Sequence, residues 1–242
     1  MNLTRSKKKD LLYVAVAAFF FLTACVLQTV DDYISDLSVK KTIALLTQYI
    51  FFGLLAYWTA SVISRISDKS ICSGIIVAIA LMGGILFVRL LKYHVFYDGT
   101  VMRYLWYSYY IPHCLAPAVL LITLLGMGRK DGKPLAKGWY LLFLPAAALI
   151  LLVFTNDLHE QVFSFAKGLK YSNEIYKWEW GYYFILSWIA VLYLSIGVLL
   201  YIKCRVSGCR KKAWIPLVLF IVCIVLCVLR EVFDPVFIRM PE

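Results

Sequence analysis

Charged residues are scarce in this sequence. Of its 242 residues, 16% are Asp, Glu, Lys or Arg and 62% are hydrophobic, whereas about a quarter of the residues in soluble domains are charged. The mean hydropathy is +0.80. This composition excludes an ordinary soluble domain and predicts a protein embedded in a membrane.

The sequence also lacks motifs on which common catalytic mechanisms depend. It has three histidines, no HExxH zinc motif and no glycine-rich phosphate loop. The histidines are His94, His113 and His159, and their spacing with Asp98 and Asp157 matches no metal motif. We therefore expect no catalytic residues, no metal and no other cofactor, so that the protein is not an enzyme.

Long apolar runs dominate the sequence instead. A membrane-spanning helix needs about 20 mainly apolar residues. Seven runs qualify: residues 11–30, 43–64, 73–91, 104–127, 139–154, 181–202 and 213–230. The first run ends without a small-residue cleavage site, so we expect it to be retained. The predicted fold is an all-α integral membrane protein, with a tail over 1–10 and one bundle of seven transmembrane helices over 11–242.

Basic residues are distributed unevenly along the chain. Fifteen of the 25 Lys and Arg residues lie in the tail 1–10 and in the connections 65–72, 128–138 and 203–212. The positive-inside rule places these segments in the cytoplasm, with the N-terminus inside, the C-terminus outside and residues 154–180 extracytoplasmic. The net charge of +11 is thus interpreted as a topology signal with anionic-lipid contact, and nucleic acid is not an expected partner.

Cysteines are missing from the predicted outer connections. All seven lie in predicted spans or on the cytoplasmic side, so we expect no disulfide framework. The pairs Cys204–Cys209 and Cys223–Cys227 lack the additional Cys or His ligands of a metal site, and we interpret them as small apolar residues.

Aromatic residues are concentrated at the outer end of the fourth predicted span, in the sequence YLWYSYY. Two interpretations are open: anchoring at the membrane interface, which Tyr and Trp favour, or an aromatic-lined ligand pocket that opens outward. The spacing of Arg103, Tyr107, Tyr110 and Cys114 predicts that they share one helix face.

Prolines and buried ionisable residues mark further candidates. Pro112 and Pro117 are predicted to break the fourth span, and Pro145 the fifth. His113, between the first two prolines, is either a functional residue facing the bundle interior or an ordinary hydrogen-bonded histidine.

Arg89 near the end of the third run has two predicted roles. Its guanidinium reaches outward to the interface, or it pairs with Glu231 or Asp234 beside the end of the seventh run.

The stretch VFTNDLHEQVF, residues 153–163, follows the fifth span. Asp157 with Glu160 three positions later has the spacing of a capping box. Leu158, Val162 and Phe165 form an apolar stripe at helical spacing. We therefore predict a short amphipathic helix on the outer face, an interpretation that leaves the choice of His159 unexplained.

The combination of R-Y-L-x-Y-x3-I-P, a basic connection, F-L-P and T-N-D-L-H resembles the seven-transmembrane N-terminal sensor region of bacterial histidine kinases. The resemblance extends over about residues 43–233. It implies a multi-pass protein of the bacterial plasma membrane that detects a signal. The resemblance implies Arg103, Tyr104, Pro112, Asn156 and His159 as residues for sensing. The remaining sensing candidates are Tyr107 from its shared helix face, His113 from its depth, and Glu231 from its place at the end of the seventh run.

Two departures from the resemblance matter. The chain begins with an extra span and carries neither the last span nor a kinase domain of that family. We therefore expect a stand-alone receptor, one half of a split system or a truncated product. Its expected partners are the lipid bilayer, a separate kinase or regulator protein, and a second copy in a homodimer.

His159-Glu160 is not interpreted as a phospho-acceptor, because phosphoryl transfer needs ATP-binding machinery. The function predicted from the sequence is a membrane sensor in bacterial signal transduction. The alternatives are a small transporter or channel-type subunit, which would be expected to show internal repeats and broken helices with charges at mid-membrane, and a membrane-embedded enzyme.

Overall fold

The computed structural model describes residues 15–24, 26–27, 34, 36–96, 98–128, 135–165, 176–203 and 218. Five helical segments in this part of the chain are long and apolar enough to cross a membrane. They are α2 (Leu37–Arg65), α3 (Lys69–His94), α4 (Gly99–Ser108) with α5 (Tyr110–Gly126), η2 (Lys137–Leu142) with α6 (Phe143–Phe154), and α8 (Trp180–Lys203). They confirm a mainly helical membrane protein and coincide with five of the seven predicted runs.

The structure describes neither of the other two predicted runs in full. Of the run 11–30, the structure describes the apolar helix Ala15–Ala24. The run 213–230 lies outside the described residues apart from residue 218. The number of seven spans and the orientation across the membrane therefore stay predictions.

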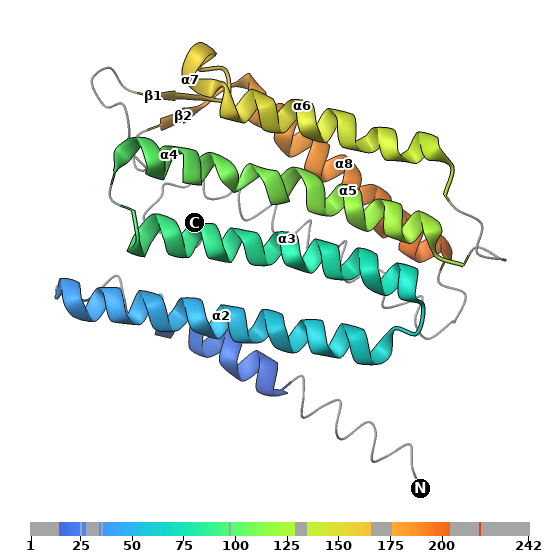
Figure 1. Cartoon of the computed structure of the whole chain (residues 1–242), viewed down its shortest axis with the longest axis horizontal. Coiled ribbons are helices and arrows are strands. Elements are labelled where there is room, and N and C mark those ends of the chain that lie inside the picture. The colour runs from blue at the N-terminus through green and yellow to red at the C-terminus, as the bar shows by residue number, and fades with distance from the viewer. Residues whose placement is uncertain are drawn as a thin grey trace, which may run out of the picture.

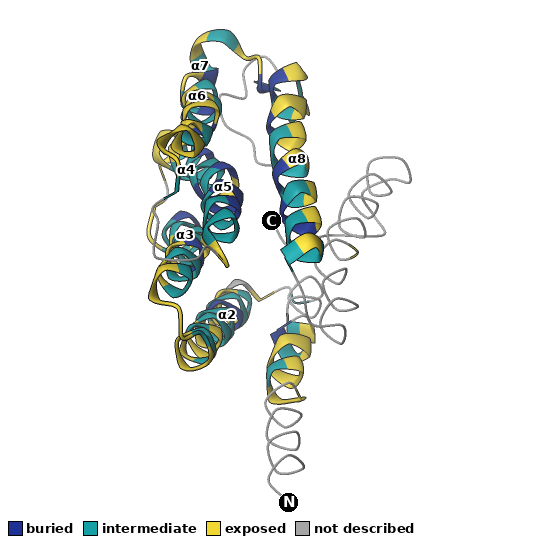
Figure 2. Cartoon of the chain, turned by 90° about the vertical axis from the view of Figure 1, so that its right-hand side faces the viewer, coloured by how far each residue is buried: buried dark blue, intermediate teal, exposed yellow. Residues whose placement is uncertain are grey.

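Consecutive long helices run in opposite directions (Figure 1). The connection between α2 and α3 therefore lies at the same end of the bundle as the C-terminal ends of α5 and α8, and α7 (Asn156–His159) lies at the other end. Helices α2, α3, α5 and α6 form one curved layer, and α8 lies against one face of this layer beside α5 (Figure 2). Helix α5 is central because it packs against both α3 and α8.

Small side chains allow this close packing around α5. Cys114, Ala116 and Ala118 are buried on it, and a Cβ atom added at Gly74 of α3 would overlap the side chain of Thr123 on α5. Small residues at helix contacts let backbones approach closely, as is common inside membranes.

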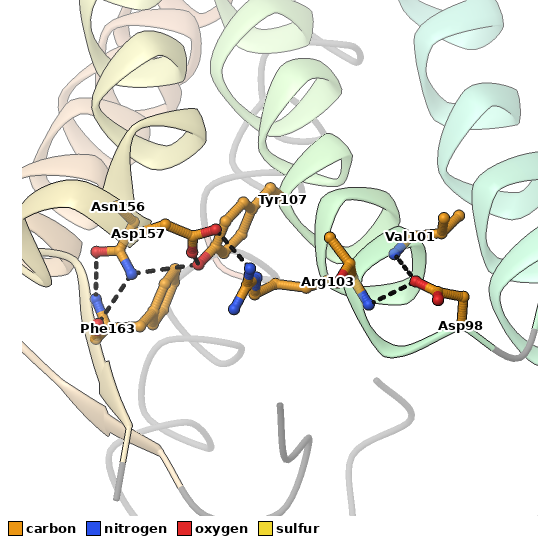
Figure 3. Close-up of polar contacts among 8 residues, drawn as sticks. Asp98, Val101, Arg103, Tyr107, Asn156, Asp157 and Phe163 are labelled. Carbon is orange, nitrogen blue, oxygen red and sulfur yellow. Dashed lines mark hydrogen bonds and ion pairs between the residues drawn. The ribbon is translucent and has the colours of Figure 1, made fainter. Parts of the chain in front are cut away.

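Three aspartates cap the helices. Asp36, Asp68 and Asp98 each accept hydrogen bonds from two backbone N–H groups at the start of α2, α3 and α4, respectively. Such caps satisfy N–H groups that have no partner within the helix. Asp98 was considered above together with the histidines as a possible metal ligand. In the structure its carboxylate caps α4 (Figure 3).

The prolines act at helix junctions. Pro112 has no N–H to bond the carbonyl of Ser108, and α4 ends at that residue. Pro145 lies in the first turn of α6, where a 3₁₀ segment changes to an α-helix. The predicted break at Pro117 is wrong: α5 continues through it, and Trp188 of α8 donates a hydrogen bond to the nearby carbonyl of Cys114, at 3.3 Å.

The prediction of an amphipathic helix after the fifth span is also wrong. α7 ends at His159, and the next residue, Glu160, has a left-handed φ of 49°. The chain then enters β1 (Phe163–Phe165), which pairs antiparallel with β2 (Tyr176–Trp178). Val162 and Phe163 are fully buried, whereas Leu158 is 86% exposed. The helical spacing of the apolar residues was therefore coincidental, because the burial follows the turn and the strand.

Candidate functional site

Four polar side chains meet where α4 approaches α7. Nη2 of Arg103 lies 2.7 Å from Oδ2 of Asp157, and the Tyr107 hydroxyl donates to Oδ1 of the same carboxylate at 2.8 Å. Asn156 donates from Nδ2 to the Tyr107 oxygen at 3.3 Å (Figure 3). We call Arg103, Tyr107, Asn156 and Asp157 the polar lock.

Local structure explains why these residues meet. Arg103 and Tyr107 are four positions apart on α4 and therefore point from the same helix face. Asn156 and Asp157 follow directly after α6, which packs against α4. Asp157 is thus not the N-cap that its spacing to Glu160 predicted: its carboxylate bonds across to α4.

Burial differs within the polar lock. Tyr107 and Asn156 are fully buried, whereas the side chains of Arg103 and Asp157 are 17% and 21% exposed. The ion pair is therefore partly exposed at the surface of the protein, whereas its neutral partners are buried.

Asn156 also holds the start of the hairpin. Its Oδ1 accepts from the backbone N–H groups of Val162 at 2.9 Å and Phe163 at 3.0 Å. Its Nδ2 donates to the Phe163 carbonyl at 2.9 Å. Because a buried amide must find partners for its donors and acceptors, Asn156 links three elements: α7, β1 and, through Tyr107, α4.

Aromatic rings surround Phe163 of the hairpin. Its ring centroid lies 4.5 Å from that of Trp106 and 5.6 Å from those of Tyr110 and Tyr176. These rings form a packed cluster beside the polar lock. Tyr104, which is 40% exposed, lies at its rim, with the Arg103 guanidinium 5.9 Å from its ring centroid.

His159 has a hydrogen-bond set of its own, apart from the polar lock. Its Nδ1 accepts from the Gln161 backbone N–H at 3.0 Å, and its Nε2 lies 3.2 Å from the Thr155 hydroxyl. That hydroxyl donates to the Leu151 carbonyl of α6 at 2.7 Å. His159 thereby connects the end of α6 to the turn before β1.

The remaining predicted site residues lie elsewhere. Pro112 is buried at the start of α5. His113 is exposed and bonds to the carbonyl of Tyr109, the residue before α5. Of the two interpretations, this geometry favours the ordinary hydrogen-bonded histidine over a residue that faces the bundle interior. Glu231 lies outside the described residues, as do both predicted acidic partners of Arg89.

The contact between Asp157 and Arg103 was not predicted from the sequence. The available signal was depth: Arg103 precedes one predicted span and Asp157 follows the next, so that both are expected at the same membrane face.

A second polar contact was not predicted at all. Lys203, the last residue of α8, donates from Nζ to the carbonyls of Leu124, Leu125 and Met127, at 2.6, 2.9 and 2.7 Å. Its charge thus satisfies the C-terminal carbonyls of α5, where cations are favoured. We call this contact the lysine clamp; it lies at the opposite end of the bundle from the polar lock.

Among the described residues, no three His, Cys, Asp or Glu side chains are arranged to hold a metal ion. No protein-family model, curated protein or solved structure matches the chain.

Proposed function

We propose that this chain is the membrane-embedded sensor of a bacterial signal-transduction system. It responds to a signal outside the cytoplasm or within the bilayer, and it acts on a separate kinase or regulator protein. The observation that supports this proposal most is the polar lock, in which a partly exposed ion pair joins two helical segments at one end of the bundle.

The energetics of the polar lock suit a switch. A partly exposed ion pair contributes only about 1 kcal/mol or somewhat more to stability. A ligand shifts a two-state equilibrium by as much as its affinities for the two states differ. A ligand of ordinary affinity therefore has enough free energy to exchange the Arg103–Asp157 contact for another arrangement.

Helices α5 and α8 connect the polar lock to the opposite end of the bundle. α5 begins beside the polar lock, after the junction at Tyr109, and its last carbonyls bind the lysine clamp. Along α8, contacts with neighbouring elements come from Gly181, Trp188 and Lys203. These positions are separated by nearly whole numbers of helical turns, so they share one face, and a shift of α8 would disturb all three contacts.

The test is made on the full chain in the bacterium that carries its gene. Arg103→Asp and Asp157→Arg are introduced singly and together at the chromosomal locus, and transcript levels are compared without any stimulus. Each single variant is expected to change one common set of transcripts several-fold, and the double variant to restore them because the opposite charges meet again.

Two further variants sharpen the test. Lys203→Met is expected to change the same transcripts, since it releases the C-terminal end of α8 from α5. The matched control is Lys177→Met, at an exposed lysine of β2, which should have no effect. Unchanged transcripts in every variant at normal protein level would contradict the proposal. Solute uptake by proteoliposomes that contain the purified chain would support the transporter alternative instead.

A further inference from the structure

We propose that His159 is a proton-binding site that controls the turn between α7 and β1. Binding of a proton by the imidazole releases the Gln161 backbone and loosens the start of the hairpin. That this release is the signal rests on the proposed sensor function; the release itself does not.

The hydrogen bonds of His159 define its protonation state. A backbone N–H can only donate, so the Nδ1 atom that accepts from Gln161 carries no proton. The Thr155 hydroxyl has a single hydrogen, which it donates to the Leu151 carbonyl. Its oxygen therefore accepts a hydrogen bond from Nε2–H of His159. The ring is therefore neutral, with its single proton on Nε2.

A second proton on the ring must go to Nδ1, the atom that the Gln161 N–H occupies. The protonated Nδ1 would then face another donor, and the contact would become repulsive. The bond from Nε2 to Thr155 would persist, because that nitrogen is protonated in both states. Protonation thus removes one defined contact and leaves the imidazole tethered to the end of α6.

Gln161 is the point from which this change spreads. Its carbonyl accepts from the Gly181 backbone N–H of α8 at 2.9 Å, and Val162 and Phe163, which Asn156 holds, follow directly. The side chain of Gln161 is exposed. The backbone of Gln161 is therefore held mainly by its hydrogen bonds to His159 and Gly181. Loss of the bond to His159 loosens the turn between α7 and β1, which lies against the first turn of α8.

Other charged groups surround the turn. α6, on which α7 packs, has no titratable side chain. On α4, Arg103 pairs with Asp157. Beside the hairpin, Glu179 accepts from Ser164 at 2.7 Å, and Lys177 is exposed, as is Glu160 next to His159. Because these carboxylates also bind protons in acid, the test must separate them from the imidazole.

The test measures amide hydrogen exchange of a peptide covering residues 156–165 in the full chain in lipid nanodiscs. It is run at about pH 7.5 and about pH 5.5, so that the proton concentration differs about a hundredfold between the two measurements. A peptide from α3 corrects for the intrinsic pH dependence of exchange. In the unaltered chain, protection is expected to fall about tenfold on acidification, the effect of losing one hydrogen bond.

Two substitutions of His159 distinguish its ring atoms. In His159→Asn, the amide oxygen takes the place of Nδ1 but binds no proton in this range, so protection should stay high at both pH values. In His159→Gln, the longer side chain reaches the position of Nε2 and leaves Gln161 without an acceptor, so protection should be low at both. His94→Asn is the matched control and should keep the response of the unaltered chain.

The proposal is overturned if the unaltered chain shows no pH response, or if His159→Asn retains it, since a carboxylate would then be responsible. The transcript assay is run separately at the same two pH values. A turn that opens in acid without any change in transcripts would leave the proton site standing and count against the sensor function alone.

Discussion

Arg103 and Asp157 form an ion pair between two segments that are distant in the sequence: α4, which opens one spanning segment, and α7, which follows the next. Tyr107 binds the same carboxylate, and Asn156 connects that hydroxyl to the hairpin. One end of the bundle is thus held by hydrogen bonds and an ion pair between side chains of different elements.

A double-mutant cycle tests this ion pair directly. Arg103→Gln and Asp157→Asn are each expected to lower the free energy of unfolding by about 1–2 kcal/mol, and the coupling between them to be about 1 kcal/mol. The measurement is a denaturant titration in mixed micelles. Strictly additive effects would mean that the two charges contribute independently and that the polar lock is not a unit.

Asn156 should be the most sensitive position of the polar lock. Asn156→Ala leaves two buried backbone N–H groups, those of Val162 and Phe163, without an acceptor. Each such loss costs about 1–3 kcal/mol, so the expected loss of stability is about 3 kcal/mol or more. The same titration measures it.

The matched control for Asn156 is Leu158→Ala, two positions further along α7. Its side chain is 86% exposed, so the change should stay within about 0.5 kcal/mol. Equal effects at the two positions would show that the hydrogen bonds of Asn156 do not hold the hairpin.

The sequence predicted the spanning helices well and the segment after the fifth span poorly, for a physical reason. A helix such as α3 makes its backbone hydrogen bonds internally, so apolar length alone predicts it. The direction of the chain after α7 depends instead on one side chain, Asn156, that binds backbone groups of Val162 and Phe163. Apolar spacing carries no information about such a contact.

The candidate site was predicted in the same uneven way. Arg103, Tyr107 and Asn156 were singled out from their residue types and from the resemblance to a sensor family, and they do lie together. Asp157 was explained as a helix cap, since local spacing alone cannot distinguish a cap from a partner on another helix. Lys203 was counted only as a positive charge, although its ammonium binds two carbonyls of α5 and that of Met127, the residue after it.

Gly181 should resist substitution because α8 begins against the hairpin turn. A Cβ atom at this position would lie 2.8 Å from the Gln161 carbonyl oxygen and 3.1 Å from Cγ2 of Val162. Since the nearest atom belongs to the backbone, Gly181→Ala is expected to destabilise the chain by about 1–3 kcal/mol. Hydrogen exchange should rise in the peptide 156–165.

Gly84 of α3 is the control for Gly181, because a Cβ atom there meets nothing within 4 Å. Gly84→Ala should be neutral or slightly stabilising, since alanine favours the helix. A neutral Gly181→Ala would mean that α8 and the turn are further apart than this packing requires.

The orientation across the membrane can be tested with two cysteines at opposite ends of one spanning segment. Leu158, just beyond α6, and Ala136, just before η2, are both exposed. In a chain whose native cysteines are replaced by alanine, a membrane-impermeant maleimide should label Leu158→Cys in intact cells. Ala136→Cys should react only after permeabilisation, because the positive-inside rule places residues 128–138 in the cytoplasm.

The opposite labelling pattern would invert the protein and place the polar lock and His159 on the cytoplasmic side. The proton that His159 binds would then come from the cytoplasm, and the lysine clamp would lie outside. The hydrogen bonds of the polar lock would be unchanged by this inversion. The labelling experiment therefore decides which compartment the proposed sensor monitors, independently of the substitutions that test how its parts are connected.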